Sequence, residues 1–104
     1  MRRVFIGGFR DDVETQDEET KQVIAKLPEI DLHIVKAAPQ WPLNQMNKVD
    51  IAILRISVYE LLSKDTPENV VIDEAVEIAK EYGAEHSPSF VNGVLATIVK
   101  TLQQ

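Results

Sequence analysis

The residues whose side chains could best bind a ligand lie in the segment HSPSFVNGVL, residues 86–95. Phe90 offers an aromatic ring on which a single-stranded nucleic-acid base can stack, an interaction worth about 1–3 kcal/mol per base. Ser87 and Ser89 bring hydroxyls to the start of a helix, where free backbone N–H groups can bind a phosphate. Asn92 carries an amide that can hydrogen-bond a base edge. These positions serve either packing or a partner.

Each of these residues also has a structural interpretation, and at this point both interpretations stay open. Phe90 can pack in the apolar stripe of a helix, and Asn92 can hold a neighbouring loop through its backbone groups. Ser87 is a natural N-cap, with Pro88 at the first helical position. Gly93 costs about 1 kcal/mol in a helix interior relative to Ala, so we expect it to let another helix backbone come close.

Catalytic and metal-binding chemistry has little support in the sequence. The run IGGF, residues 6–9, lacks the Lys and the spacing of a phosphate loop. His33 and His86 have no partners at ligand spacing. There are no cysteines, which excludes disulfides, thiolate zinc sites and Cys nucleophiles. We therefore expect no enzymatic activity, no metal site and no cofactor.

Composition bounds the class of protein. A chain of 104 residues with 44% hydrophobic residues fits one small globular domain. No run approaches the roughly 18 apolar residues of a membrane span, and the N-terminal apolar run is too short for a signal peptide. We expect a cytoplasmic protein. The net charge of −6 opposes nucleic-acid binding, because attraction to phosphates normally supplies much of the affinity.

The first third of the chain divides into two parts. Residues 1–19 read as an N-terminal arm or acidic linker, and residues 20–104 as the helical domain. A helix is expected from about Thr20, and Pro28 either kinks it or begins a second one. The following break, APQWPL, contains Trp41 between two prolines, and we expect its side chain to plug the core at a corner.

The strongest predicted helix is NKVDIAILRISVYELLS, residues 47–63. It is apolar on nearly all sides, which predicts a central, buried helix. Arg55 lies in its middle and could reach RNA, or could pair with Asp50, Glu60 or Asp73. Pairing is favoured because a buried, unpaired charge is costly.

Two more helices complete the prediction. One has Thr66 as its N-cap with Pro67 at the first helical position, and Gly83 ends it. The last runs from about Pro88 toward Leu102. No segment after residue 20 shows strand alternation, so the predicted fold class is all-α, with four or five helices.

Three runs in this order resemble the NusB family of bacterial transcription antitermination factors: WPLNQMNKVDIAILRISVYELL, VVIDEAVEIAKEYGAEHSP and SFVNGVL. The resemblance covers roughly residues 20–102. It implies a compact helical bundle of the NusB type, here with a reduced N-terminal half. It also implies binding of boxA-like single-stranded RNA together with a small-subunit ribosomal protein of the NusE type, within the antitermination complex on RNA polymerase.

The resemblance and the residue chemistry together define the candidate sites. The candidate RNA-binding residues are Arg2, Arg3, Arg55, Ser87, Ser89, Phe90 and Asn92. Asp50 and Glu60 match positions near the family's ribosomal-protein interface.

Two departures from the family pattern support an alternative function. The family usually begins with an Arg-rich helix, whereas only Arg2, Arg3 and Arg10 lie near this start. The family also often has an acidic residue at the position of His86 and a basic one at that of Ser89. The alternative is a NusB-like protein-interaction module that has lost RNA binding. In either case we expect a homodimer in which VFIGGF or the early helices cover exposed apolar surface.

Overall fold

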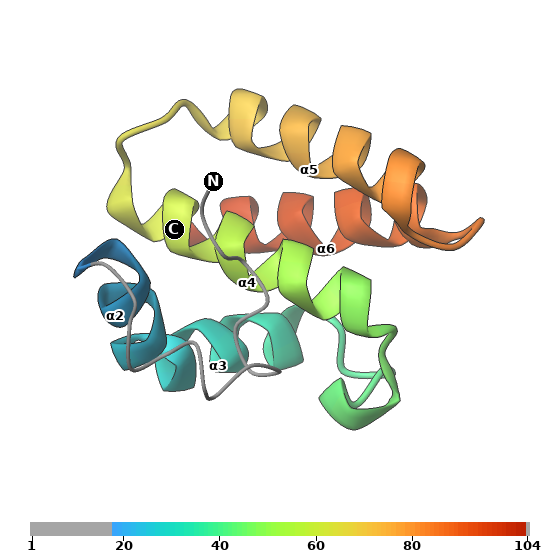
Figure 1. The fold of residues 1–104 in the computed structure, drawn as a ribbon, viewed down its shortest axis with the longest axis horizontal. Coiled ribbons are helices and arrows are strands. Elements are labelled where there is room, and N and C mark those ends of the chain that lie inside the picture. The colour runs from blue at the N-terminus through green and yellow to red at the C-terminus, as the bar shows by residue number, and fades with distance from the viewer. Residues whose placement is uncertain (1–17, 104) are drawn as a thin grey trace.

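The computed structural model of the protein describes residues 18–103, and the side chains from residue 21 onward (Figure 1). Arg2, Arg3 and the VFIGGF run lie outside the described residues. The first described helix begins at Glu18, close to the expected start of the helical domain. The division of the chain into an arm, 1–19, and a domain, 20–104, stays a prediction.

Helices account for the regular structure of the described part of the chain. They are α2 (Glu18–Ala25), α3 (Leu27–Ala37), the 3-10 turn η1 (Leu43–Gln45), α4 (Lys48–Ser63), α5 (Glu68–Tyr82) and α6 (Ser87–Leu102). Residues 18–103 contain no strand, and the predicted all-α class is confirmed. The open question at Pro28 is resolved, because α2 and α3 are separate helices and Pro28 lies in the first turn of α3. A proline is tolerated there since the first turn has no intrahelical partner for its missing N–H.

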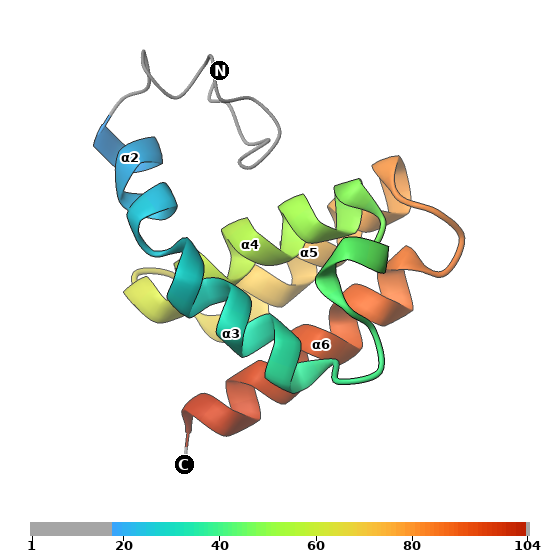
Figure 2. The same ribbon diagram turned by 90° about the horizontal axis from the view of Figure 1, so that it is seen from below.

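Helix α4 lies at the centre of the bundle and contacts α3, α5 and α6 (Figure 1). Its buried apolar side chains are Ile53, Leu54, Val58 and Leu61. They meet buried residues of the surrounding helices, which are Ile30, Ile34, Val71, Ala75, Ala79, Val91, Val94, Leu95 and Ile98. The predicted central, buried helix is confirmed. Helix α2 packs mainly against α3 and stands at the edge of the bundle (Figure 2).

The start of α5 differs by one residue from the prediction. Pro67 is the N-cap, and no side chain caps the helix, so Thr66 does not have the expected role. The carbonyl of Pro67 accepts the first helical bonds from the N–H groups of Val70 and Val71. Proline has fixed φ and no N–H to satisfy, so it serves at this boundary in either position.

The corner between α5 and α6 depends on a glycine and a serine. Gly83 is the C-cap of α5, as predicted. A Cβ on Gly83 would lie 2.5 Å from Cβ of Ser87 and 2.8 Å from the carbonyl oxygen of Ala79, so this close approach requires glycine. The N-cap position of α6 is His86 rather than Ser87. Ser87 is buried, and its Oγ accepts a hydrogen bond from the N–H of Ala84 at 2.8 Å, which closes the corner.

Two packing predictions are wrong. The side chain of Trp41 is 52% exposed and does not plug the core, because Leu43 and Met46 of the next turn pack against the core instead. Gly93 is exposed, and a Cβ added there would meet no atom within 4 Å, so no helix approaches closely. Gly93 faces solvent because its neighbours Val91 and Val94 occupy the buried side of α6.

Candidate nucleic-acid interface

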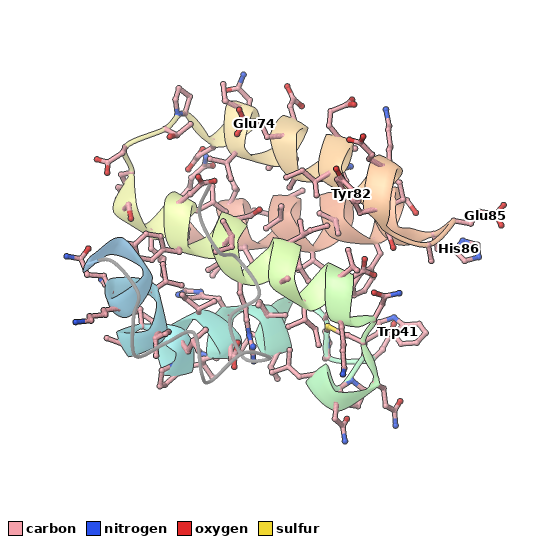
Figure 3. All side chains as sticks on the ribbon, in the orientation of Figure 1. Trp41, Glu74, Tyr82, Glu85 and His86 are labelled. Carbon is pink, nitrogen blue, oxygen red and sulfur yellow. The ribbon has the colours of Figure 1, made fainter. Side chains whose placement is uncertain are left out.

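An aromatic pair joins the loop after α3 to the first turn of α6. The rings of Trp41 and Phe90 are 6.3 Å apart between centroids, with an interplanar angle of 80°, which is an edge-to-face arrangement. Such pairs contribute about 0.5–1.5 kcal/mol beyond area burial. Phe90 is partly buried against the core, whereas Trp41 projects outward from the bundle (Figure 3). Phe90 therefore packs in the helix stripe and also supports an aromatic surface that is open to solvent.

Polar residues of the same helix start differ in their availability. Ser89 is exposed, and its Oγ donates to the carbonyl oxygen of His86 at 3.2 Å, so its lone pairs and position remain open to solvent. Ser87 is buried with its hydroxyl committed to Ala84, so a phosphate could not reach it without opening the corner. Of the two candidate serines, only Ser89 lies on the surface.

Asn92 lines a groove between α5 and α6. Its side chain is exposed and has no hydrogen-bond partner among the described residues, so the expected role of holding a loop is not seen. The groove is lined by Asp73, Val76, Glu77, Lys80, Pro88, Ser89 and Asn92. Two carboxylates and one ammonium make this groove mainly acidic.

Arg55 has a structural role in the described part of the chain, because it forms an ion pair between two helices. Its Nε and one terminal nitrogen donate to the two carboxylate oxygens of Asp31 on α3, each at 3.0 Å. The prediction that Arg55 pairs with a carboxylate is confirmed, and the partner seen here, Asp31, was not among the three residues considered. The bidentate geometry fixes the guanidinium on the α3 side of α4.

Asp50 and Glu60, the two candidate partner-binding residues, lie on α4 but far apart. Asp50 is in the first turn and Glu60 in the last, and ten residues of helix separate them by about 15 Å along the axis. Asp50 is 7% exposed, and its Oδ1 is buried with no hydrogen-bond donor among the described residues. Glu60 is half-buried and interacts with other residues.

The structure thus brings together a subset of the candidate RNA residues. Ser89 and Asn92 face the groove with α5, whereas Phe90, about 200° round the helix from Asn92, meets Trp41. Arg55 faces α3. Trp41 lies beside Phe90 but was not among the residues predicted from the sequence. The two prolines beside Trp41 predicted a turn. A turn does not fix whether an aromatic side chain points toward the core or toward solvent.

Residues 18–103 give no support for a metal site or for a membrane-spanning helix. That range holds no group of three or more His, Cys, Asp or Glu side chains that could hold a metal ion. None of its helices is long and apolar enough to cross a membrane.

Comparison with known proteins identifies the family. The model of the NusB family matches residues 10–100 of the chain. The chain belongs to the NusB family. Solved NusB from T. maritima superimposes with a TM-score of 0.75 at 40% sequence identity, covering 93% of this chain and 82% of that one. The helical bundle described above is therefore the NusB fold, and the predicted resemblance is confirmed.

Curated relatives carry the description "Transcription antitermination protein NusB". The relative from Geobacter sulfurreducens is 45% identical over 87 residues, which are 83% of this chain and 63% of that protein. The relative from Thermoanaerobacter sp. is 49% identical over 77 residues, covering 74% and 55%. That from Chloroflexus aggregans is 55% identical over 73 residues, covering 67% and 49%. The chain thus spans about half to three fifths of the length of these NusB relatives.

Proposed function

We propose that this chain is an RNA-binding transcription antitermination factor that contacts boxA-like single-stranded RNA through the aromatic surface of Trp41 and Phe90. The observation that carries the proposal is the edge-to-face pair between these rings, which keeps a half-exposed Trp beside the exposed start of α6. The description of the NusB relatives as antitermination proteins supports the same assignment.

The geometry suits stacking of unpaired bases. Edge-to-face contact with Phe90 restrains the Trp41 ring while about half of its surface stays accessible. A restrained ring loses less side-chain entropy when a base stacks on it. Ser89, one residue before Phe90, offers a hydroxyl to the backbone of the same RNA strand. Asn92 faces the groove with α5 and stays a candidate for contact with a base.

Cationic groups on this side of the molecule are few. Lys48 is exposed at the first position of α4. We exclude Arg55 from the contact because Asp31 holds its guanidinium. Binding should therefore rest more on stacking than on charge, with a shallow dependence of affinity on salt. Arg2 and Arg3 stay candidates for phosphate contact.

Asp50 supports the second half of the proposal, which is binding of a NusE-type ribosomal protein. A buried carboxylate oxygen without a donor is rare in native structures. Oδ1 is closed to solvent, so a cationic or N–H group of the ribosomal protein would complete the site only after the first turn of α4 opens. Glu60, at the other end of α4, would need a separate contact.

The proposal is tested by fluorescence anisotropy with labelled boxA-like and scrambled single-stranded RNA, at low and moderate salt, with and without the ribosomal protein. Selective binding of the boxA-like RNA supports the proposal. Equal binding of both RNAs in the presence of the ribosomal protein contradicts it. Tyr82→Ala, measured on the chain without the ribosomal protein, is the matched control variant, because Tyr82 is an exposed aromatic residue on a different helix, α5.

A protein-interaction module without RNA binding is the second candidate. The net charge of −6 and the serine, rather than a basic residue, at position 89 favour it. It predicts capture of the ribosomal protein with no preference among RNAs. A role within the RNA polymerase antitermination complex belongs to either proposal.

A homodimer also stays a prediction. Leu32 and Val35, one helical turn apart on α3, are exposed by 53% and 43%. Burial of this pair against a second copy would remove apolar surface from water. Light scattering over a hundredfold range of concentration tests it, and a constant monomer mass would contradict it.

A further inference from the structure

The outward side of α5 carries apolar residues that the core does not use. Val70, Ile78 and Tyr82 are exposed by 36%, 46% and 66%. Together with Glu74 they follow a spacing of four residues, which aligns neighbours along a helix surface. Helix α5 packs on α4 and α6 through Val71, Ala75 and Ala79, and the row lies outside this buried set.

Carboxylates run beside the apolar row at the same spacing. Asp73, Glu77 and Glu81 are exposed and four residues apart, and Glu74 lies within the row itself. Lys80 is the one basic side chain among them, and its Nζ lies 3.4 Å from Oε2 of Glu77. Asp73 and Glu77 also line the groove between α5 and α6. We call the row and these carboxylates together the outer face of α5.

Two occupants of this face are disfavoured by charge. A second copy of the chain would place two acidic rows against each other, and like charges brought together across an interface are costly. RNA would bring phosphates to the same carboxylates. Figure 3 shows Glu74 on the upper side of α5, away from Trp41, whereas Asp73 and Glu77 adjoin Ser89 and Asn92 in the groove between α5 and α6.

We propose that the outer face of α5 is a docking surface for a basic amphipathic helix of a partner protein. Apolar side chains of that helix would cover Ile78 and Tyr82, and its Lys or Arg side chains would pair with Glu77 and Glu81. Tyrosine is enriched in interface cores, and a helix recognised by its apolar face is a recurrent mode of binding. The groove provides room for one long basic side chain beside Asp73.

The test uses NMR on the ¹⁵N-labelled full chain with a defined probe. The probe is an 18-residue helical peptide with Leu at every fourth position flanked by Lys, and its matched control has Glu in place of each Lys. We expect the basic peptide to shift amide resonances of α5 and of the start of α6 in a saturable manner. We expect the acidic peptide to shift none of them.

Paired variants separate specific docking from general attraction to an acidic protein. The double variants Ile78→Ser with Tyr82→Ser, and Glu77→Gln with Glu81→Gln, should each weaken the basic peptide by about tenfold or more. The controls are Leu32→Ser with Val35→Ser on α3, and Glu29→Gln with Asp65→Asn. These controls remove the same numbers of exposed apolar and acidic groups elsewhere and should change the affinity less than about twofold.

Three results would overturn the proposal. Equal weakening by the controls would mean that net charge alone attracts the peptide. Shifts of α5 resonances on dilution of the free protein would make a second copy the occupant. Shifts of Val70, Glu74 and Ile78, which lie outside the groove lining, caused by boxA-like RNA would make this face part of the nucleic-acid surface. Because none of these readouts requires RNA binding at Trp41, failure here is distinguishable from failure of the proposed function.

Discussion

Arg55 on α4 donates two parallel hydrogen bonds to Asp31 on α3, both at 3.0 Å. The pair is partly buried, with side-chain exposures of 18% and 25%. It joins the central helix to a helix 24 residues earlier in the chain. A residue type that suggests nucleic-acid contact in the sequence is thus used to fix the position of α3.

The first prediction concerns this pair. Arg55→Ala should destabilise the fold because it leaves the Asp31 carboxylate without its bidentate partner. A double-mutant cycle with Asp31→Ala should give a coupling of about 1–3 kcal/mol in urea unfolding. Arg55→Lys should lose most of that coupling, since an ammonium cannot form the fork. Fully additive effects of the two substitutions would contradict the assignment.

The second prediction concerns the corner between α5 and α6. Gly83→Ala should cost about 1–3 kcal/mol of unfolding free energy, because the new Cβ would overlap Ser87 and the backbone of Ala79. Thermal and urea unfolding both measure this cost. An unchanged midpoint would mean that the corner relaxes freely and that the glycine is not required.

The third prediction concerns Gly93, which lies inside α6, and has the opposite sign. Gly93→Ala should stabilise the protein by about 1 kcal/mol, because α6 gains helix propensity and nothing lies within 4 Å of the new Cβ. The same unfolding experiments apply. A loss of stability would show that an unrecognised neighbour occupies that side of α6.

The fourth prediction concerns Asp50. Asp50→Asn keeps the shape but removes the charge, so affinity for the ribosomal protein should fall about tenfold or more, as measured by calorimetry. Unfolding free energy should change by less than about 1 kcal/mol, since Oδ1 has no donor among the described residues whose bond would be lost. Unchanged affinity would exclude Asp50 from the interface. Asp65→Asn, an exposed acidic residue in the loop after α4, is the matched control.

The sequence predicted those parts of the fold that local rules determine. The spacing of apolar residues predicted the position of α4, and Gly83 predicted the end of α5. Both signals act within a few residues. The partner of Arg55 was not predictable in this way, since Asp31 becomes a neighbour only when α3 packs on α4. Trp41 shows the same limit, because two prolines predict a turn but not the direction in which its side chain points.

The candidate site was predictable only where the family pattern and the helix start coincide. Phe90 and Ser89 were found from the run SPSFVNGVL, and the structure places both at the exposed end of α6. The sequence predicts Ser87 as an N-cap, but in the tight corner beside Gly83 its hydroxyl accepts a hydrogen bond from the N–H of Ala84. That consequence depends on the geometry of a corner between two helices and has no signature in the spacing of the residues.

The central claim is that Trp41 and Phe90 form the base-stacking surface, and anisotropy with boxA-like RNA on the variants Trp41→Ala and Tyr82→Ala tests it most directly. The account predicts that Trp41→Ala weakens binding of the boxA-like RNA about 5–100-fold, corresponding to about 1–3 kcal/mol for one stacked base. Tyr82→Ala should bind like the unaltered chain. Equal affinity of the Trp41→Ala variant and the unaltered chain, with the fold intact by circular dichroism, would contradict the account.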